Sequence, residues 1–154
     1  MITRLGVASV FVFDYDEAKR FFLDKLGFEQ RFDLRMDDGM RWLTVGPPAD
    51  PGFQLSLHVP GPPMQDEQTA RTIRELVAAG ALSAGAWTTD DCRATYAAYR
   101  ARGVEFLQEP REVPYGVEAV FRDPFGNWYS LNELNEAALD PEAMGERFGP
   151  GDAG

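Results

Sequence analysis

A single histidine sets the limit on the acid–base chemistry available to this chain of 154 residues. His58 follows Gln54 and Ser56 at intervals of two, and alternate residues of a strand share one face, so the three side chains should project together. Because the unperturbed pKa of histidine, about 6.5, lies near neutral pH, His58 is the candidate catalytic residue. Pro60 follows closely, however, and a solvated histidine at a strand end is the plainer interpretation.

Nucleophilic chemistry finds little support in the sequence. The single histidine would have to act as the general base in any such reaction, and no nucleophile elbow is present. Neither glycine pattern of a phosphate-binding loop occurs. Cys92 is the only cysteine, which excludes an intramolecular disulfide and a thiolate metal cluster. A chain without disulfides suits a reducing compartment, so we expect a cytoplasmic protein.

The charge balance narrows the range of partners. With 25 acidic against 15 basic residues, the formal net charge is -10, and the chain scarcely supplies the basic patch that nucleic acid phosphates or anionic lipids require. No apolar run approaches the roughly 18 to 20 residues that span a bilayer. We therefore expect no nucleic acid and no membrane partner, but a neutral or cationic small molecule. Solubility alone explains the acidity equally well.

The elements that must position these residues begin with a strand, a helix and three further strands. A helix is predicted from Asp14 or Asp16 to Gly27, where the glycine supplies a left-handed stop. Residues 61–82 are predicted to hold a connecting helix. Alternating and β-branched patterns predict strands at 7–13, 28–36, 41–45 and 53–59.

The second half of the chain repeats this order. A helix is predicted from Asp90 or Asp91 to Arg102, with its alanines facing inward, and Gly103 ends it as Gly27 ends the first. The predicted strands are 84–89, 104–107, 117–122 and 128–131, and the inward alanines are Ala94, Ala97, Ala98 and Ala101. The matching Asp-to-Gly spacing of the two halves indicates an internal repeat of about 76 residues, with the unit βαβββ.

Two stretches carry more particular motifs. Val10–Phe28 joins the first strand to an aromatic helix that ends in Leu-Gly-Phe, and Thr89–Cys92 precedes the Ala-rich helix of the second half. Phe121–Trp128, with the sequence FRDPFGNW, closes the last hairpin. In this order, and with the internal duplication, they resemble the glyoxalase, bleomycin-resistance and extradiol dioxygenase family, the vicinal oxygen chelate superfamily, over residues 4–133.

The resemblance implies an α+β fold in which two βαβββ modules in tandem form a curved mixed sheet around a cleft, with the helices on the outer face. It implies one glyoxalase/bleomycin-resistance-like domain over residues 1–133, and an acidic, loosely ordered C-terminal tail follows over 134–154. Within the domain, module one is 1–60, the connecting helix 61–82 and module two 83–133. Fold alone does not fix function.

In metal-dependent members of that superfamily, the ligands are His, Gln or Glu on the first and last strands of each module. The first-strand position falls on Val7, and its counterpart in the second module falls on Ser83 or Ala84. The last-strand position falls on Ser130, and the remaining one near Gln54. Because a divalent transition metal needs about three N, O or S ligands, we expect a cleft without metal and no cofactor.

A small-molecule pocket needs flat side chains with a few polar groups. The strands and turns that surround the cleft of this family carry the candidate ligand-binding residues Ser9, Phe11, Trp42, Gln54, Ser56, Trp87, Tyr115, Trp128 and Ser130. Core packing explains any single aromatic among them at least as well. Glu118 and Glu112 would make such a pocket acidic for a cationic ligand, or would simply face solvent, and the sequence leaves both open.

Three functions follow from these residues and from the resemblance. The favoured one is a binding protein of the antibiotic-resistance kind, which sequesters an aromatic or cationic molecule in a metal-free cleft. An enzyme is the alternative: a metal-dependent lyase or dioxygenase with relocated ligands such as Gln54, His58 and Glu118, or a metal-free isomerase or cyclase that uses His58. A third possibility is a regulatory or assembly module with a vestigial cleft. Because these proteins often pair modules across a dimer, we expect a homodimer.

Overall fold

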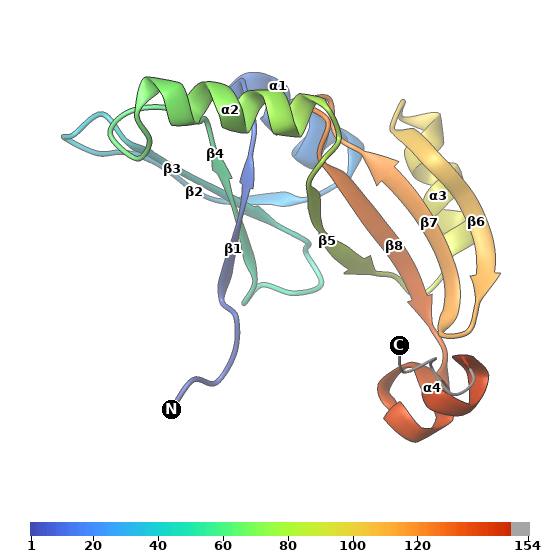
Figure 1. The fold of residues 1–154 in the computed structure, drawn as a ribbon. Helices are drawn as coiled ribbons and strands as arrows, with labels where there is room; N and C mark the ends of the chain where they lie inside the picture. Colours follow the sequence, from blue (N-terminus) through green and yellow to red (C-terminus); the bar gives the residue numbers. More distant parts are fainter. Residues whose placement is uncertain (149–154) are drawn as a thin grey trace. The chain divides into compact units, whose positions relative to one another are not determined.

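Two four-stranded sheets with the same strand order form the protein, which a computed structural model describes for residues 1–148 (Figure 1). The first sheet has the order β1-β4-β3-β2 and the second the order β5-β8-β7-β6. This repetition confirms the predicted α+β class with tandem βαβββ modules. Two compact units divide the chain: the first holds residues 1–84 and 123–127, and the second begins at Gly85 and holds the other described residues.

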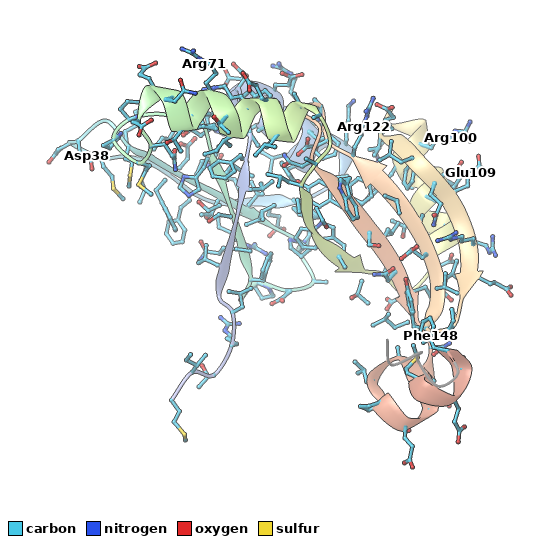
Figure 2. All side chains as sticks on the ribbon, viewed as in Figure 1. Asp38, Arg71, Arg100, Glu109, Arg122 and Phe148 are labelled. Atoms are coloured by element: carbon cyan, nitrogen blue, oxygen red, sulfur yellow. The ribbon has the colours of Figure 1, made fainter. Side chains whose placement is uncertain are left out.

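The first unit follows the predicted order closely. Asp14 caps the first helix, where its carboxylate accepts the Glu17 N–H at 2.7 Å, and Gly27 follows with φ of 74°. Asp38 lies at the tip of the hairpin between the second and third strands (Figure 2). The elements are β1 (Val7–Phe11), α1 (Tyr15–Lys19), the π-helical η1 (Arg20–Lys25), β2 (Glu29–Arg35), β3 (Arg41–Gly46), β4 (Gln54–His58) and α2 (Glu67–Ala78).

The two faces of the first sheet differ in character. One face is apolar and buried through Val10, Leu43, Val45, Leu55 and Leu57, and Ala18, Phe21 and Phe22 of α1 and η1 supply further buried apolar surface. Burial of each large apolar side chain contributes roughly 1.5 to 3 kcal/mol. The alternate residues of the same strands form the opposite face, called here the first open face. α2 packs against β1 and belongs to the same unit (Figure 1).

The second unit has longer strands than the sequence patterns predicted. The strands predicted at 104–107 and 128–131 extend over nine and seven residues. In β6, two register shifts allow the strand to continue through the irregular sequence around Pro110. The elements are β5 (Ser83–Thr88), α3 (Cys92–Ala101), β6 (Glu105–Val113), β7 (Gly116–Arg122), β8 (Trp128–Leu134), η2 (Glu136–Leu139), a 3-10 helix, and α4 (Pro141–Phe148).

The predicted orientation of α3 was wrong. The four alanines that were expected to face inward, Ala94, Ala97, Ala98 and Ala101, are all exposed. Cys92 is fully buried instead, and the Tyr96 and Tyr99 rings lie against Phe106 and Phe121, at 4.6 Å and 6.2 Å between centroids. Aromatic rings gain far more from burial than methyl groups do, whereas alanine favours a helix wherever it stands, so the rings decided which face packs.

The turn between β7 and β8 is built by a carboxylate. Asp123 Oδ1 accepts the backbone N–H groups of Phe125, Gly126 and Asn127 at 3.0 to 3.1 Å. The Asn127 amide donates to Asp123 Oδ2 at 2.8 Å and to the Phe11 carbonyl at 2.7 Å. The FRDPFGNW motif therefore has a structural role: it fixes this turn against the end of β1.

The C-terminal segment departs from its expectation. Within the described residues the predicted tail forms η2 and α4, and Asn135 caps η2 while its amide donates to the Pro114 carbonyl at 3.0 Å. Arg147 donates to the same carbonyl at 2.7 Å. Residues 149–154 of the predicted tail lie outside the described part. Across residues 1–148, no helix is long and apolar enough to cross a membrane.

Candidate functional site

The first open face gathers six of the predicted site residues. The register pairs Ser9 on β1 with Ser56 on β4, and Phe11 with His58. Leu43 pairs with Leu57, so the same register, continued by one residue, sets Trp42 of β3 opposite His58. The six are Ser9, Phe11, Trp42, Gln54, Ser56 and His58.

Hydrogen bonds organise the centre of this face. The buried Thr44 hydroxyl donates to Gln54 Oε1 at 2.8 Å, and the buried Ser56 hydroxyl lies 3.1 Å from His58 Nε2. His58 is half-buried, and this burial lowers the pKa of its imidazole below the usual 6.5. The ring is therefore neutral at pH 7, able to donate one hydrogen bond and accept another.

An apolar border on β2 continues the first open face, and the sequence analysis missed it. Phe32 pairs with Thr44, Leu34 pairs with Trp42, and Met36 follows at the same spacing. All three are exposed, at 46%, 51% and 43%. The alternation that predicted the strand already placed them on one face, but only the register with β3 shows that this face carries Trp42.

Glu118 organises the corresponding open face of the second sheet. Its Oε2 atom accepts the Tyr115 hydroxyl at 2.5 Å and the Ser130 hydroxyl at 3.1 Å. Its Oε1 atom accepts the Gln108 amide at 3.2 Å and lies 3.5 Å from the Arg111 guanidinium. We call these five residues the Glu118 cluster.

Two pKa values respond to this arrangement. Burial alone would raise the pKa of Glu118, but the hydrogen bonds from Tyr115, Gln108 and Ser130 and the charge of Arg111 outweigh it and hold the pKa below its usual value. The hydrogen bond to Glu118, with burial and the carboxylate charge, raises the pKa of Tyr115 to about 12. At neutral pH the pair is therefore a carboxylate and a protonated phenol.

The remaining predicted residues are distributed over the second sheet. Trp128 and Ser130 lie on the same face of β8 as Asn132, which the register pairs with Glu118. Trp87 is half-buried on β5, the edge strand next to β8, and Glu112 is exposed on β6. Gln108 escaped the sequence analysis, since the register shifts in β6 hide which of its residues share a face with β7. Asn132 was also missed, although it follows Ser130 by two residues on β8 and alternation could have found it. The roles of all these residues as ligand contacts stay predictions.

The residues at the metal positions of the resembled superfamily do not fit a metal ion. Val7 offers no donor atom, Gln54 Oε1 already accepts the Thr44 hydroxyl, and the Ser130 hydroxyl donates to Glu118. No group of three or more His, Cys, Asp or Glu side chains within residues 1–148 is arranged to hold a metal. We therefore derive no reaction step through a metal.

Taken together, the tandem βαβββ units and their open polar faces define a protein of the vicinal oxygen chelate class. The family model for the Glyoxalase/Bleomycin resistance protein/Dioxygenase superfamily matches residues 4–131. The chain belongs to this family.

Several relatives are similar over most of their length. The crystal structure of UcmS2 is 46% identical with a TM-score of 0.82, covering 86% of this chain and 99% of that one. TnmS3, an antibiotic binding protein from Streptomyces sp. CB03234, is 31% identical with a TM-score of 0.69, covering 87% and 98%. An uncharacterized protein of Shewanella frigidimarina is 33% identical over 124 residues, 80% of this chain and 87% of the relative.

Proposed function

We propose that this protein binds an aromatic small molecule and sequesters it without chemical conversion. The observation that carries the proposal is the first open face, where Phe11, Trp42 and the β2 border surround a hydrogen-bonded polar centre at His58. Flat apolar side chains around a few fixed polar groups are the usual lining of a small-molecule site. The antibiotic-binding relative TnmS3 supports an antibiotic-like ligand.

The misfit at the metal positions favours binding over the enzymatic alternative. A metal-dependent lyase or dioxygenase of this family would need metal ligands at these positions. Val7 has no donor atom, and the side chains of Gln54 and Ser130 already form hydrogen bonds within the protein. His58 remains as a neutral base, but its hydrogen-bond partner is the Ser56 hydroxyl rather than a carboxylate that would orient it for proton transfer. Binding through stacking and hydrogen bonds needs neither metal ligands nor an oriented base.

The assembly and location of the protein form the second part of the proposal. The strands β2 and β6 each end a sheet, and unpaired strand edges favour pairing with a second copy. We propose a homodimer, which sedimentation equilibrium would detect as twice the chain mass. The single, buried Cys92 supports a cytoplasmic location, since it needs no oxidising compartment.

Isothermal titration calorimetry tests the binding proposal with a panel of naphthalene derivatives and larger fused-ring compounds. We expect saturable binding by members of the panel and a loss of about tenfold in affinity for Trp42→Ala, because a stacked ring contributes roughly 0.5 to 1.5 kcal/mol beyond its buried area. Leu139→Ala is the control, as it removes an exposed apolar side chain of η2. Absence of binding across the panel, or near-stoichiometric transition metal in protein purified without chelator, would contradict the proposal.

A further inference from the structure

Most of the hydrogen-bonding capacity of Glu118 is already used within the protein. An ionised carboxylate offers about four lone-pair positions. Tyr115 and Ser130 donate to Oε2 and Gln108 donates to Oε1, while the Arg111 guanidinium forms an ion pair with Oε1 at 3.5 Å. This carboxylate therefore acts on its neighbours rather than directly on a bound molecule.

Its effect is to fix the hydrogen-bond polarity of the surrounding groups. A hydroxyl group has one hydrogen to donate, and Tyr115 and Ser130 both spend theirs on Glu118. The Gln108 amide spends one of its two N–H groups on Glu118, which leaves its second N–H and its carbonyl oxygen for other groups. Towards any other group, the Tyr115 and Ser130 hydroxyls therefore present only lone pairs.

A fourth acceptor on the same face is already without a partner. Asn132 is the register partner of Glu118 on β8, so their side chains stand side by side on one face. Its Oδ1 atom is buried and accepts no hydrogen bond. Because an unsatisfied buried acceptor costs about 1 to 3 kcal/mol, a ligand that donates to it recovers that loss. A purely structural role for the cluster leaves Asn132 unexplained.

We propose that Glu118 makes the Tyr115 and Ser130 hydroxyls, on the open face of the second sheet, an acceptor subsite that selects a neutral hydroxyl donor, such as a phenol, on the ligand. The inference rests on the proposed function, to which it adds the chemical class of the ligand. A neutral donor fits better than an ammonium, since the Arg111 guanidinium balances the Glu118 charge at 3.5 Å.

Three probes of nearly the same shape test this polarity: 2-naphthol, 2-methoxynaphthalene and 2-naphthylmethylammonium. Their dissociation constants can be measured by titration of backbone amide NMR shifts, which tolerates weak binding. We expect the naphthol to bind at least about fivefold more tightly than the ether, the lower end of what one satisfied buried acceptor provides. The ammonium should bind no more tightly than the naphthol.

Two variants test whether the named residues cause the preference. Glu118→Gln frees the donors around it, and Asn132→Ala removes the unpaired acceptor without breaking a hydrogen bond of the structure, so each should bring the naphthol and the ether to within about twofold. Glu105→Gln is the matched control, because Glu105 loses the same charge on β6, where it pairs with Arg122 at 2.7 Å. The control should keep the full preference.

A readout without ligand checks the cluster itself. In a spectrophotometric titration of the five tyrosines, the one that Tyr115→Phe removes should have a pKa of about 12 in the wild-type chain and ionise earlier in Glu118→Gln. In a variant that remains folded, this shift shows that the Glu118–Tyr115 hydrogen bond exists in the wild-type chain.

The outcomes separate the two proposals. Equal binding of naphthol and ether by the wild-type chain, much tighter binding of the ammonium, or a preference that survives Glu118→Gln would each overturn the acceptor subsite and leave aromatic binding standing. If none of the three probes binds while the tyrosine titration shows an intact cluster, both proposals fall for this class of ligand.

Discussion

At the scale of single residues, Gly126 shows how closely the β7–β8 turn approaches a helix. Its φ is 115°, in a region that side chains disfavour, and a Cβ there would lie 2.2 Å from the Val77 carbonyl oxygen of α2. Gly39 in the β2–β3 hairpin also has a positive φ, of 86°, but a Cβ there would meet nothing within 4 Å. A side chain at Gly39 would therefore meet backbone strain alone, whereas one at Gly126 would meet backbone strain and steric overlap.

Alanine at each position should therefore have different effects on stability. Gly39→Ala should lower the free energy of unfolding by about 1 kcal/mol, the cost of a left-handed backbone. Gly126→Ala adds the overlap with Val77 and should lower it by about 3 kcal/mol. Urea unfolding of both variants measures the difference, and equal losses would show that the turn does not approach α2 as described.

At the scale of elements, the hydrophobic periodicity and the helix-capping residues predicted most of the helices and strands. The side on which a helix packs and the register between strands became visible only in the structure. Asp14, Gly27 and the alternating strands located the first module to within a few residues. The inner face of α3 was misread, because alanine spacing shows that a helix forms but not which side packs. Residues of the Glu118 cluster come from three segments whose alignment depends on register shifts in β6, which no local pattern reveals.

The corrected orientation of α3 predicts which of its positions tolerate change. The double variant Ala97→Gln/Ala98→Gln should alter the free energy of unfolding by less than about 1 kcal/mol, since both alanines are exposed. Tyr99→Ala should cost about 3 kcal/mol, because it removes a ring packed on Phe121. Thermal and urea unfolding provide both values, and a loss above 2 kcal/mol for the double variant would return the alanines to the interior.

At the scale of the whole molecule, two buried or half-buried groups should give the stability of this acidic protein a two-step pH dependence. Arg41 and Lys19 donate to Asp33 at 2.5 to 2.9 Å and hold the pKa of its carboxyl well below 3.8. Burial holds the pKa of His58 below 6.5. Each folded-state pKa lies below the unfolded one, so within each window the unfolded chain binds more protons, and stability falls as pH falls.

The two windows begin at different pH values, which makes the contributions separable. The His58 contribution is complete above pH 6.5 and is lost as pH falls towards its lowered pKa, whereas the Asp33 contribution is complete above pH 3.8 and is lost only below it. Urea unfolding from about pH 3 to about pH 7, at one protein concentration, should show the upper step and the onset of the lower one. His58→Gln should flatten the upper step alone and Asp33→Asn the lower one, while Asp37→Asn, at the exposed hairpin, should leave both. A His58→Gln profile identical to wild type would mean that the histidine is fully solvated in the native state, and its half-buried position beside Ser56 would then have to be abandoned.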